Sequence, residues 1–197
     1  HKNFKNYLNA KLILFREILK ANKYVISDSL IKEFKKINHI SKKKNLKVLD
    51  INNTYKEIKK IKINLIGEFQ LKNLSMAILA ASLCNLNYKK IIKSLNRIKN
   101  VEGRLSEIKS FKNGARVFID FAHTPAALEN VLKSLKKNFN SKISIVFGCG
   151  GDRDFKKRPL MGKIASSFCD KIYITDDNPR FENPNKIRKE IIKGIRK

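Results

Sequence analysis

Two short polar segments in the second half of the chain carry residue types suited to binding phosphate and an amino acid. Residues 148–154 read GCGGDRD and lead into a basic segment over 157–162, and residues 177–180 read Asp-Asn-Pro-Arg. Glycines allow a tight turn with close approach of the backbone to a ligand. Arginine offers a permanent charge with bidentate donors. These residue types predict a site that binds both phosphate and an amino acid.

Each polar segment follows an apolar run that we expect to be a buried strand. Residues 143–147 precede the glycine-rich segment, and residues 171–175 precede the Asp-Asn-Pro-Arg segment. Ligands of open parallel sheets bind beyond the carboxyl ends of the strands. Both loops should therefore lie at the same edge of one sheet and form one site.

The elements that position these loops alternate between strand and helix. We expect strands at 116–121, 143–147 and 172–175, and helices from Thr124, from about Pro159 and from about Pro184. This alternation predicts a parallel sheet covered on both faces. No Cys-x-x-Cys spacing links Cys84, Cys149 and Cys169, so we expect neither a zinc cluster nor a disulfide framework, only buried or loop thiols.

The first half has a different pattern. Its expected elements are an amphipathic helix over 4–20, a strand at 24–26 followed by Ser27 or Asp28 as a helix cap, a loop at Lys42–Lys44, strands over 46–51 and 58–66, and helices over 73–84 and 88–98. The pattern changes near residue 102. We therefore predict two domains, residues 1–101 and 102–197.

Together with residues 120–128 (DFAHTPAAL), the two loops resemble the C-terminal domain of the Mur ligases. More narrowly, the Asp-Asn-Pro-Arg segment resembles the branch that adds meso-diaminopimelate, because lysine-adding relatives usually lack that arginine. The resemblance implies an α/β fold, in which a partial central ATPase domain precedes a Rossmann-like C-terminal Mur ligase domain.

The resemblance also implies an activity, namely ATP- and Mg²⁺-dependent amide formation in peptidoglycan biosynthesis. The terminal carboxylate of a UDP-N-acetylmuramoyl dipeptide becomes an acyl phosphate, which the amine of meso-diaminopimelate attacks. Positioning and charge neutralisation would be the protein's main contributions. A monomer in the cytoplasm is expected.

The catalytic candidates that the resemblance supplies are Lys11, Arg104 and His123. Lys11 matches a lysine that is carbamylated, and as a carbamate it would hold Mg²⁺, which prefers oxygen ligands. Apart from the resemblance it would be an ordinary surface lysine. Arg104 lies in a Gly-Arg-hydrophobic block that approaches the ATP phosphates. His123 either takes part in catalysis or is a buried, hydrogen-bonded ring that supports the turn before Pro125.

The resemblance also assigns binding residues. Asn73 would contact the adenine, although Gln70 replaces the usual Asn of that block, and Asn73 also suits a helix cap. Arg104 would bind the phosphates and Asp120 the ribose. The amino-acid substrate would be held by Arg153, Asp177, Asn178 and Arg180, since two arginines and an amide can orient a second carboxylate and amine. Asp152, Asp154 and Asp177 would orient these arginines and loops, and Pro179 would fix the turn that aims Arg180.

Composition bounds the alternatives. The 197 residues are 42% hydrophobic with a formal charge of +27, and lysine greatly outnumbers arginine. The charge is spread along the chain, so we expect no specific nucleic-acid binding. No apolar run approaches the roughly 18 residues of a membrane span, so no membrane insertion is expected. A lysine-adding, cyanophycin-type or folate-type ligase and a non-catalytic basic module for anionic polymers remain open.

The chain has no Gly-x-x-Gly-Lys-Thr/Ser phosphate loop, although the family uses one to hold ATP. It begins with His1 rather than methionine. We therefore expect an internal fragment that does not turn over alone.

Overall fold

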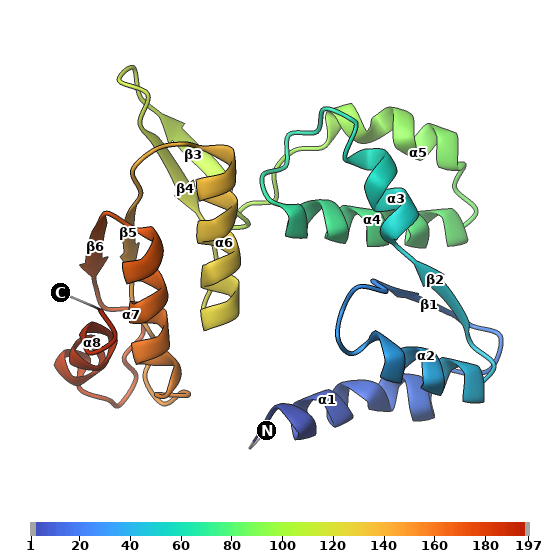
Figure 1. The fold of residues 1–197 in the computed structure, drawn as a ribbon, viewed down its shortest axis with the longest axis horizontal. Coiled ribbons are helices and arrows are strands. Elements are labelled where there is room, and N and C mark those ends of the chain that lie inside the picture. The colour runs from blue at the N-terminus through green and yellow to red at the C-terminus, as the bar shows by residue number, and fades with distance from the viewer. Residues whose placement is uncertain (1–2, 196–197) are drawn as a thin grey trace. The chain divides into compact units, whose positions relative to one another are not determined.

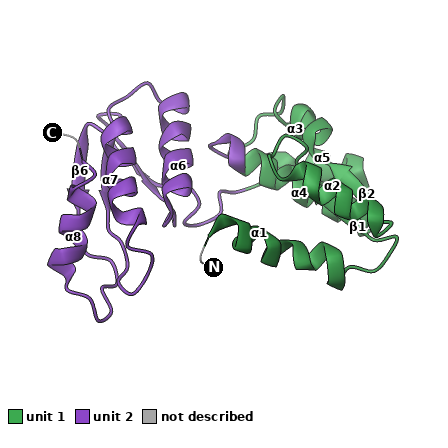
Figure 2. Cartoon of the chain, turned by 60° about the horizontal axis from the view of Figure 1, so that its bottom comes forward, with its two compact units in different colours: residues 1–63, 70–98 green, residues 64–69, 99–197 purple. Residues whose placement is uncertain are grey.

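The computed structural model describes residues 3–195 and contains two compact units. Unit 1 comprises residues 1–63 and 70–98, and unit 2 comprises residues 64–69 and 99–197 (Figure 2). The domain boundary near residue 102 stays a prediction. Among the helices of residues 3–195, none combines the length and apolar character needed to cross a membrane.

Unit 1 is built on a short parallel strand pair, in which Val25 lies opposite Val48. The elements follow one another along the chain as coloured in Figure 1. They are α1 (Phe4–Ile13), a π-helical segment (Leu14–Ile18), β1 (Tyr24–Ser27), α2 (Phe34–Lys43), β2 (Lys47–Asp50), α3 (Asn52–Ile58), α4 (Glu68–Leu83, its first residues in unit 2), α5 (Tyr88–Ser94) and a 3-10 segment (Leu95–Arg97).

Two apolar clusters stabilise unit 1. The first joins α1, β1 and α2 through Leu12, Val25 and Ile37, and the second joins α3, α4 and the 3-10 segment. The predicted helix over 4–20 is confirmed, although its last turn is π-helical. Its amphipathic character is only partly present, because Leu12 is buried whereas Phe4 is 62% exposed. The strands at 24–26 and 46–51 and the helix at 88–98 are also confirmed.

The predicted strand over 58–66 is wrong. Residues up to Ile58 belong to α3, where Thr54 and Ile58 are buried four residues apart on one helical face. Ile61 and Ile63 follow without strand structure and pack against the second cluster as partly buried side chains. The spacing of apolar residues suited a strand, but these residues form the end of a helix and the turn after it.

Three local predictions in unit 1 also need correction. Neither Ser27 nor Asp28 caps a helix: Ser27 ends β1, the carboxylate of Asp28 accepts the N–H of Leu30, and α2 begins only at Phe34. The lysine run at 42–44 is largely the last turn of α2, where cations suit the negative end of the helix dipole. Asn73 is not a cap either, because α4 already begins at Glu68.

In unit 2, the described residues form two strand pairs, three complete helices and the first residues of α4. The parallel pair places Phe147 opposite Ile174, and the antiparallel pair places Ser106 opposite Ile119. The elements are β3 (Ser106–Ser110), β4 (Arg116–Ile119), α6 (Pro125–Asn138), β5 (Ser144–Phe147), α7 (Lys157–Phe168), β6 (Lys171–Ile174) and α8 (Pro184–Ile192).

The predicted alternation of strand and helix is confirmed, and Thr124 caps α6 by accepting the N–H of Ala127. The predicted single parallel sheet is not found among the described residues. β4 pairs with β3, a strand that the sequence analysis did not predict, in an antiparallel hairpin. β3 has two charged residues and two serines in five positions, so its sequence lacks the pattern of apolar residues that would predict a strand.

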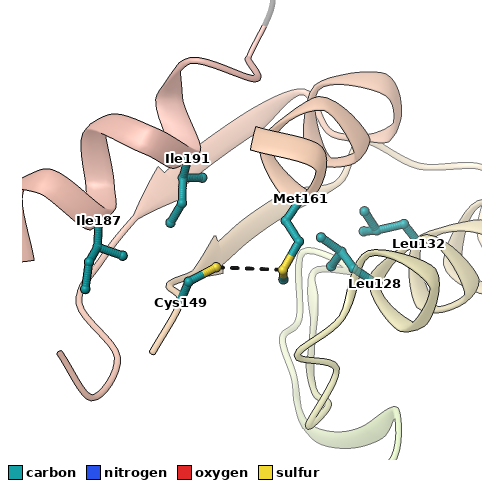
Figure 3. Packing of buried hydrophobic residues seen from close by; sticks show 6 residues of the cluster. All are labelled: Leu128, Leu132, Cys149, Met161, Ile187 and Ile191. Atoms are coloured by element: carbon teal, nitrogen blue, oxygen red, sulfur yellow. Dashed lines mark hydrogen bonds between the residues drawn. The ribbon is translucent and has the colours of Figure 1, made fainter. Parts of the chain in front are cut away.

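The core of unit 2 lies between β5, β6 and the three helices. Figure 3 shows Leu128 and Leu132 of α6, Met161 of α7, and Ile187 and Ile191 of α8 around Cys149. Apolar residues of both strands, including Ile145 and Ile174, pack against this cluster. The core therefore fixes the strand ends from which the two polar loops depart.

Candidate functional site

The two polar loops begin at opposed positions of the parallel pair. The N–H of Thr175 donates to the carbonyl of Phe147 at 3.1 Å, directly before both loops. A Cβ at Gly148 would lie 2.5 Å from the carbonyl oxygen of Thr175, so only glycine allows this approach. The prediction that both loops share one sheet edge is confirmed.

The loops also contact each other beyond the strands. The N–H of Gly151 donates to the carbonyl of Asn178 at 2.8 Å. A Cβ at Gly151 would come within 1.9 Å of the Pro179 carbonyl oxygen. The glycine-rich loop and the Asp-Asn-Pro-Arg loop therefore pack backbone against backbone.

Arg180 bridges the two loops. Its Nη1 donates to the carbonyl of Gly151 at 2.5 Å, and its own N–H donates to Oδ1 of Asn178 at 3.2 Å. Its φ of 49° lies in the left-handed region, which costs a non-glycine residue about 1–3 kcal/mol. Such strain persists only where surrounding contacts impose it.

The aspartates of the glycine-rich loop orient backbone rather than arginine side chains. Asp152 has a φ of 50°, and its Oδ2 accepts the N–H of Phe181 at 3.2 Å. Asp154 accepts the N–H of Lys156 at 3.0 Å, just before α7. Arg153 and Asp177 are exposed in these same loops. Their assigned contacts to an amino acid stay predictions.

Arg158 is a residue of this site to which the sequence analysis gave no role. Its side chain is fully buried, and it pairs with Glu182 at 2.8 Å and with Glu190 at 2.7 Å. Hydrogen bonds to Glu182, and then to Glu190, raise the pKa of Arg158 further. Hydrogen bonds from Arg158 and from the N–H of Asp152 lower the pKa of Glu182 to about 2. The pair stays charged at neutral pH.

The block around Arg104 is fixed by Asp120. One oxygen of that carboxylate accepts the N–H of Leu105, the other that of Ala122, both at 2.7 Å. Leu105 has a φ of 47°, and Arg104 beside it is exposed. An exposed guanidinium on a backbone restrained in this way fits an anionic group such as phosphate. The nucleotide contacts of Arg104 and Asp120 stay predictions.

His123 lies in the loop between β4 and α6. Its Nδ1 is 3.0 Å from the carbonyl oxygen of Phe121, and its own carbonyl accepts from Nζ of Lys157 at 2.8 Å. The ring is exposed, so the buried-ring alternative is wrong about burial, although the ring does bond within its loop. A catalytic role of His123 stays a prediction.

Lys11 and Asn73 belong to unit 1 and are both exposed. The ammonium of Lys11 lies 5.5 Å from the centre of the Tyr7 ring, a cation–π distance. Within residues 3–195, no three His, Cys, Asp or Glu side chains gather as a metal-binding group. The unmodified amine of Lys11 does not fit Mg²⁺, but its exposure fits carbamylation. The role of Lys11 as a carbamate and the adenine contact of Asn73 stay predictions.

A polar cluster around the buried Asp28, at the carboxyl ends of β1 and β2, was not predicted. Nζ of Lys72 donates to Asp28 at 2.6 Å, and Nδ2 of Asn52 bonds Asp28, Ser29 and Asp50. Burial alone would raise the pKa of Asp28, but the bonds from Lys72, Leu30 and Asn52 hold it below its usual value. The cluster fixes the start of the loops that follow both strands.

Cys149 is not a candidate nucleophile. Its side chain is buried, and burial raises the pKa of its thiol. The sulfur lies 3.7 Å from Sδ of Met161 in the core (Figure 3). Thiolates are the reactive form, so this thiol should be inert.

Comparison with known proteins supports the resemblance seen in the sequence. Residues 103–197 match the family model described as Mur ligase, glutamate ligase domain. Relatives named UDP-N-acetylmuramoyl-L-alanyl-D-glutamate--2,6-diaminopimelate ligase include one from Rickettsia typhi, 39% identical over 99% of this chain and 44% of the relative. Another, from Rickettsia conorii, is 40% identical over the whole chain and 45% of the relative. The chain thus spans less than half the length of these relatives.

Solved structures agree. A structure titled as the same 2,6-diaminopimelate ligase covers all of this chain with a TM-score of 0.53 and 25% identity, and the chain covers 45% of it. Folylpolyglutamate synthase from Mycobacterium tuberculosis, complexed with ADP, has a TM-score of 0.65 over 87% of this chain and 43% of its own, and at 16% identity it shows the fold alone. Since sequence, fold and the paired loops agree, the chain belongs to the Mur ligase family.

Proposed function

We propose that the protein carrying this chain joins meso-diaminopimelate to UDP-N-acetylmuramoyl-L-alanyl-D-glutamate by an amide bond, in an ATP-dependent reaction. The observation that carries this proposal is the contact between the glycine-rich loop and the Asp-Asn-Pro-Arg loop. That contact brings Arg180 and Asn178 to the loop that carries Arg153. The names of the relatives that align with the whole chain support the same substrate pair.

The distal end of diaminopimelate carries a carboxylate and an amine, whereas lysine has the distal amine but no distal carboxylate. Arg153 and Arg180 would pair with the carboxylate, because guanidinium groups bind carboxylates through two parallel N–H donors. Asn178 can accept from the amine and donate to the carboxylate. Both arginines are exposed in their loops, so neither must leave a buried site to bind.

The other roles follow the same proposal. Arg104 would neutralise phosphate charge, with Asp120 fixing its backbone, and Asn73 would bind the base. Lys11, as a carbamate, would provide oxygen ligands to Mg²⁺. ATP and Mg²⁺, when bound, supply the phosphoryl group that activates the carboxylate. His123, in the loop between β4 and α6, would take part in catalysis. We also expect the protein to act as a monomer in the cytoplasm.

The test is turnover of the protein at full length with ATP, Mg²⁺ and the UDP-linked dipeptide. Phosphate release that depends on meso-diaminopimelate, and is at least about 100-fold slower with L-lysine, is the expected result. Release that prefers lysine or glutamate would instead assign another ligase of the family. Salt-sensitive DNA binding with no amino-acid-dependent release would favour the basic anion-binding module.

A further inference from the structure

Arg158 places a charge inside unit 2 beside the candidate site. Its side chain has 0% exposure. Nη1 donates to Glu182 at 2.9 Å and to Glu190 at 2.7 Å, while Nη2 donates to Glu182 at 2.8 Å and to the carbonyl of Gly150 at 3.2 Å. Burial of a charge is costly unless partners satisfy it. Two carboxylates and a loop carbonyl satisfy the two terminal nitrogens here, while Nε is buried without a hydrogen-bond partner among the described residues.

Glu182 extends this pair to both loops. Its Oε1 accepts the N–H of Asp152 in the glycine-rich loop at 2.6 Å. Its own N–H donates to the carbonyl of Pro179, in the Asp-Asn-Pro-Arg loop, at 3.0 Å. The N–H of Phe181 closes the set by donating to Asp152. One residue therefore joins Arg158 to both loops.

Glu190 differs from Glu182 in its contacts. Both accept from Arg158, and their side chains have similar exposure, 20% and 23%. Glu190 lies in α8, and in the described part of the chain its side chain bonds to Arg158 without reaching either loop. Both glutamates thus pair with Arg158, Glu182 through two bonds and Glu190 through one, and Glu182 also contacts both loops.

The loops need such a restraint because each holds a non-glycine residue in the left-handed region. These residues are Asp152, with a φ of 50°, and Arg180, with a φ of 49°. Both conformations relax unless the surrounding contacts impose them. Glu182 accepts the N–H of Asp152 itself, and its own N–H donates to Pro179, the residue before Arg180.

We propose that Arg158 and Glu182 are positioning residues for the amino-acid end of the site, an inference that rests on the proposed function. The pair holds the loops at the separation at which Arg180 and Arg153 can engage the distal carboxylate of one substrate. Arg158 itself is buried and touches no substrate. Selective recognition of that carboxylate therefore depends on the hydrogen bonds of two residues outside the binding surface.

The test compares Glu182→Ala with Glu190→Ala in the protein at full length. Both changes remove one carboxylate from Arg158, so both should lower the melting temperature, and Glu182→Ala, which loses more bonds, should lower it further. Only Glu182→Ala should raise KM for meso-diaminopimelate, by about tenfold or more, with KM for ATP within about twofold of the unchanged protein. Glu182→Gln keeps an acceptor for the N–H of Asp152, so its KM for meso-diaminopimelate should return most of the way to that of the unchanged protein. If Glu182→Ala does not fold, Glu182→Asp and Glu190→Asp replace the pair.

A second readout does not depend on turnover. Exchange of the amide hydrogens of Asp152 and Phe181 should be about tenfold or more faster in Glu182→Ala and unchanged in Glu190→Ala. Equal exchange and equal KM values in the two variants would overturn the positioning role. Absence of diaminopimelate-dependent turnover in the unchanged protein would instead refute the proposed function, while the exchange rates still decide the role of Glu182.

Discussion

The guanidinium of Arg180 donates to the carbonyl of Gly151 at 2.5 Å, so the arginine of one loop is held by the backbone of the other. A guanidinium has five N–H donors, and this bond uses one of them. The remaining donors stay available for a carboxylate. Arg180 is therefore both a link between the loops and a candidate ligand of the substrate.

Replacement of Arg180 separates these two roles. Arg180→Gly and Arg180→Ala both remove the guanidinium, but only glycine tolerates the φ of 49° without strain. We expect Arg180→Gly to be more stable than Arg180→Ala by roughly 0.5–1 kcal/mol in urea unfolding. Equal stabilities would mean that the left-handed backbone is not retained in solution.

Gly151→Ala should force the loops apart. The added Cβ would lie 1.9 Å from the Pro179 carbonyl oxygen, and backbone cannot move away as a side chain can. We expect a loss of roughly 1–3 kcal/mol in stability and a higher KM for diaminopimelate. Gly114→Ala is the control, since an added Cβ there meets nothing within 4 Å and only its φ of 83° is strained. A larger loss of stability in Gly114→Ala than in Gly151→Ala would contradict the close approach of Gly151 to the Pro179 carbonyl.

Acid should weaken the bond between Glu182 and Arg158. The pKa of Glu182, about 2, is below the ordinary value of 4.5, so the folded state favours the ionised form. The contribution to stability is full above pH 4.5 and is lost as the pH falls from 4.5 toward 2. Urea midpoints between pH 6 and 3 should decline less steeply in Glu182→Gln. Parallel pH curves for the unchanged protein and Glu182→Gln would show that the ionised carboxylate of Glu182 does not stabilise the folded state.

The ion pair of unit 1 with a buried carboxylate should contribute more to stability than an exposed ion pair of equal length. Lys72 and Asp28 are 2.6 Å apart with the carboxylate side chain 4% exposed, whereas Lys133 and Glu129 are 2.6 Å apart with the carboxylate 40% exposed. Lys72→Met leaves a buried carboxylate with fewer partners and should cost roughly 1–3 kcal/mol. Lys133→Met should cost about 0–1 kcal/mol. Comparable melting temperatures of the two variants would contradict the importance of burial.

Thiol labelling checks the packing of unit 2. Cys84 is exposed, Cys149 is buried, and burial raises the pKa of Cys169 to about 11. Iodoacetamide at pH 8 should therefore label Cys84 at least about tenfold faster than the other two, as followed by mass spectrometry of peptides. Rapid labelling of Cys149 in the folded protein would mean that the core around Met161 opens.

Much of the loop pair could be predicted because its causes are local. Apolar runs followed by Gly148 and by Asp177 indicate parallel strands that end at one edge, and Thr124 before Pro125 is a strong helix start. Chain order alone suffices for such inferences. The shared edge and the cap of α6 were therefore predicted correctly.

What could not be predicted depends on contacts between distant residues. Arg158 has the appearance of one more surface cation, and its partners Glu182 and Glu190 lie 24 and 32 residues further along the chain. The strand expected over 58–66 failed because the packing of Ile58, not its spacing, decides between helix and strand. Tertiary burial outweighed the local pattern in both cases.

The most direct test of the account compares kcat/KM for meso-diaminopimelate and for L-lysine in the unchanged protein at full length and in Arg180→Ala. Loss of a charge-assisted contact of roughly 1.5–3 kcal/mol should lower the value for diaminopimelate by about 10- to 100-fold and leave that for lysine within about threefold. The preference for diaminopimelate would then shrink by the same factor. An unchanged preference in Arg180→Ala would contradict the assignment of the paired loops as the site for the distal carboxylate.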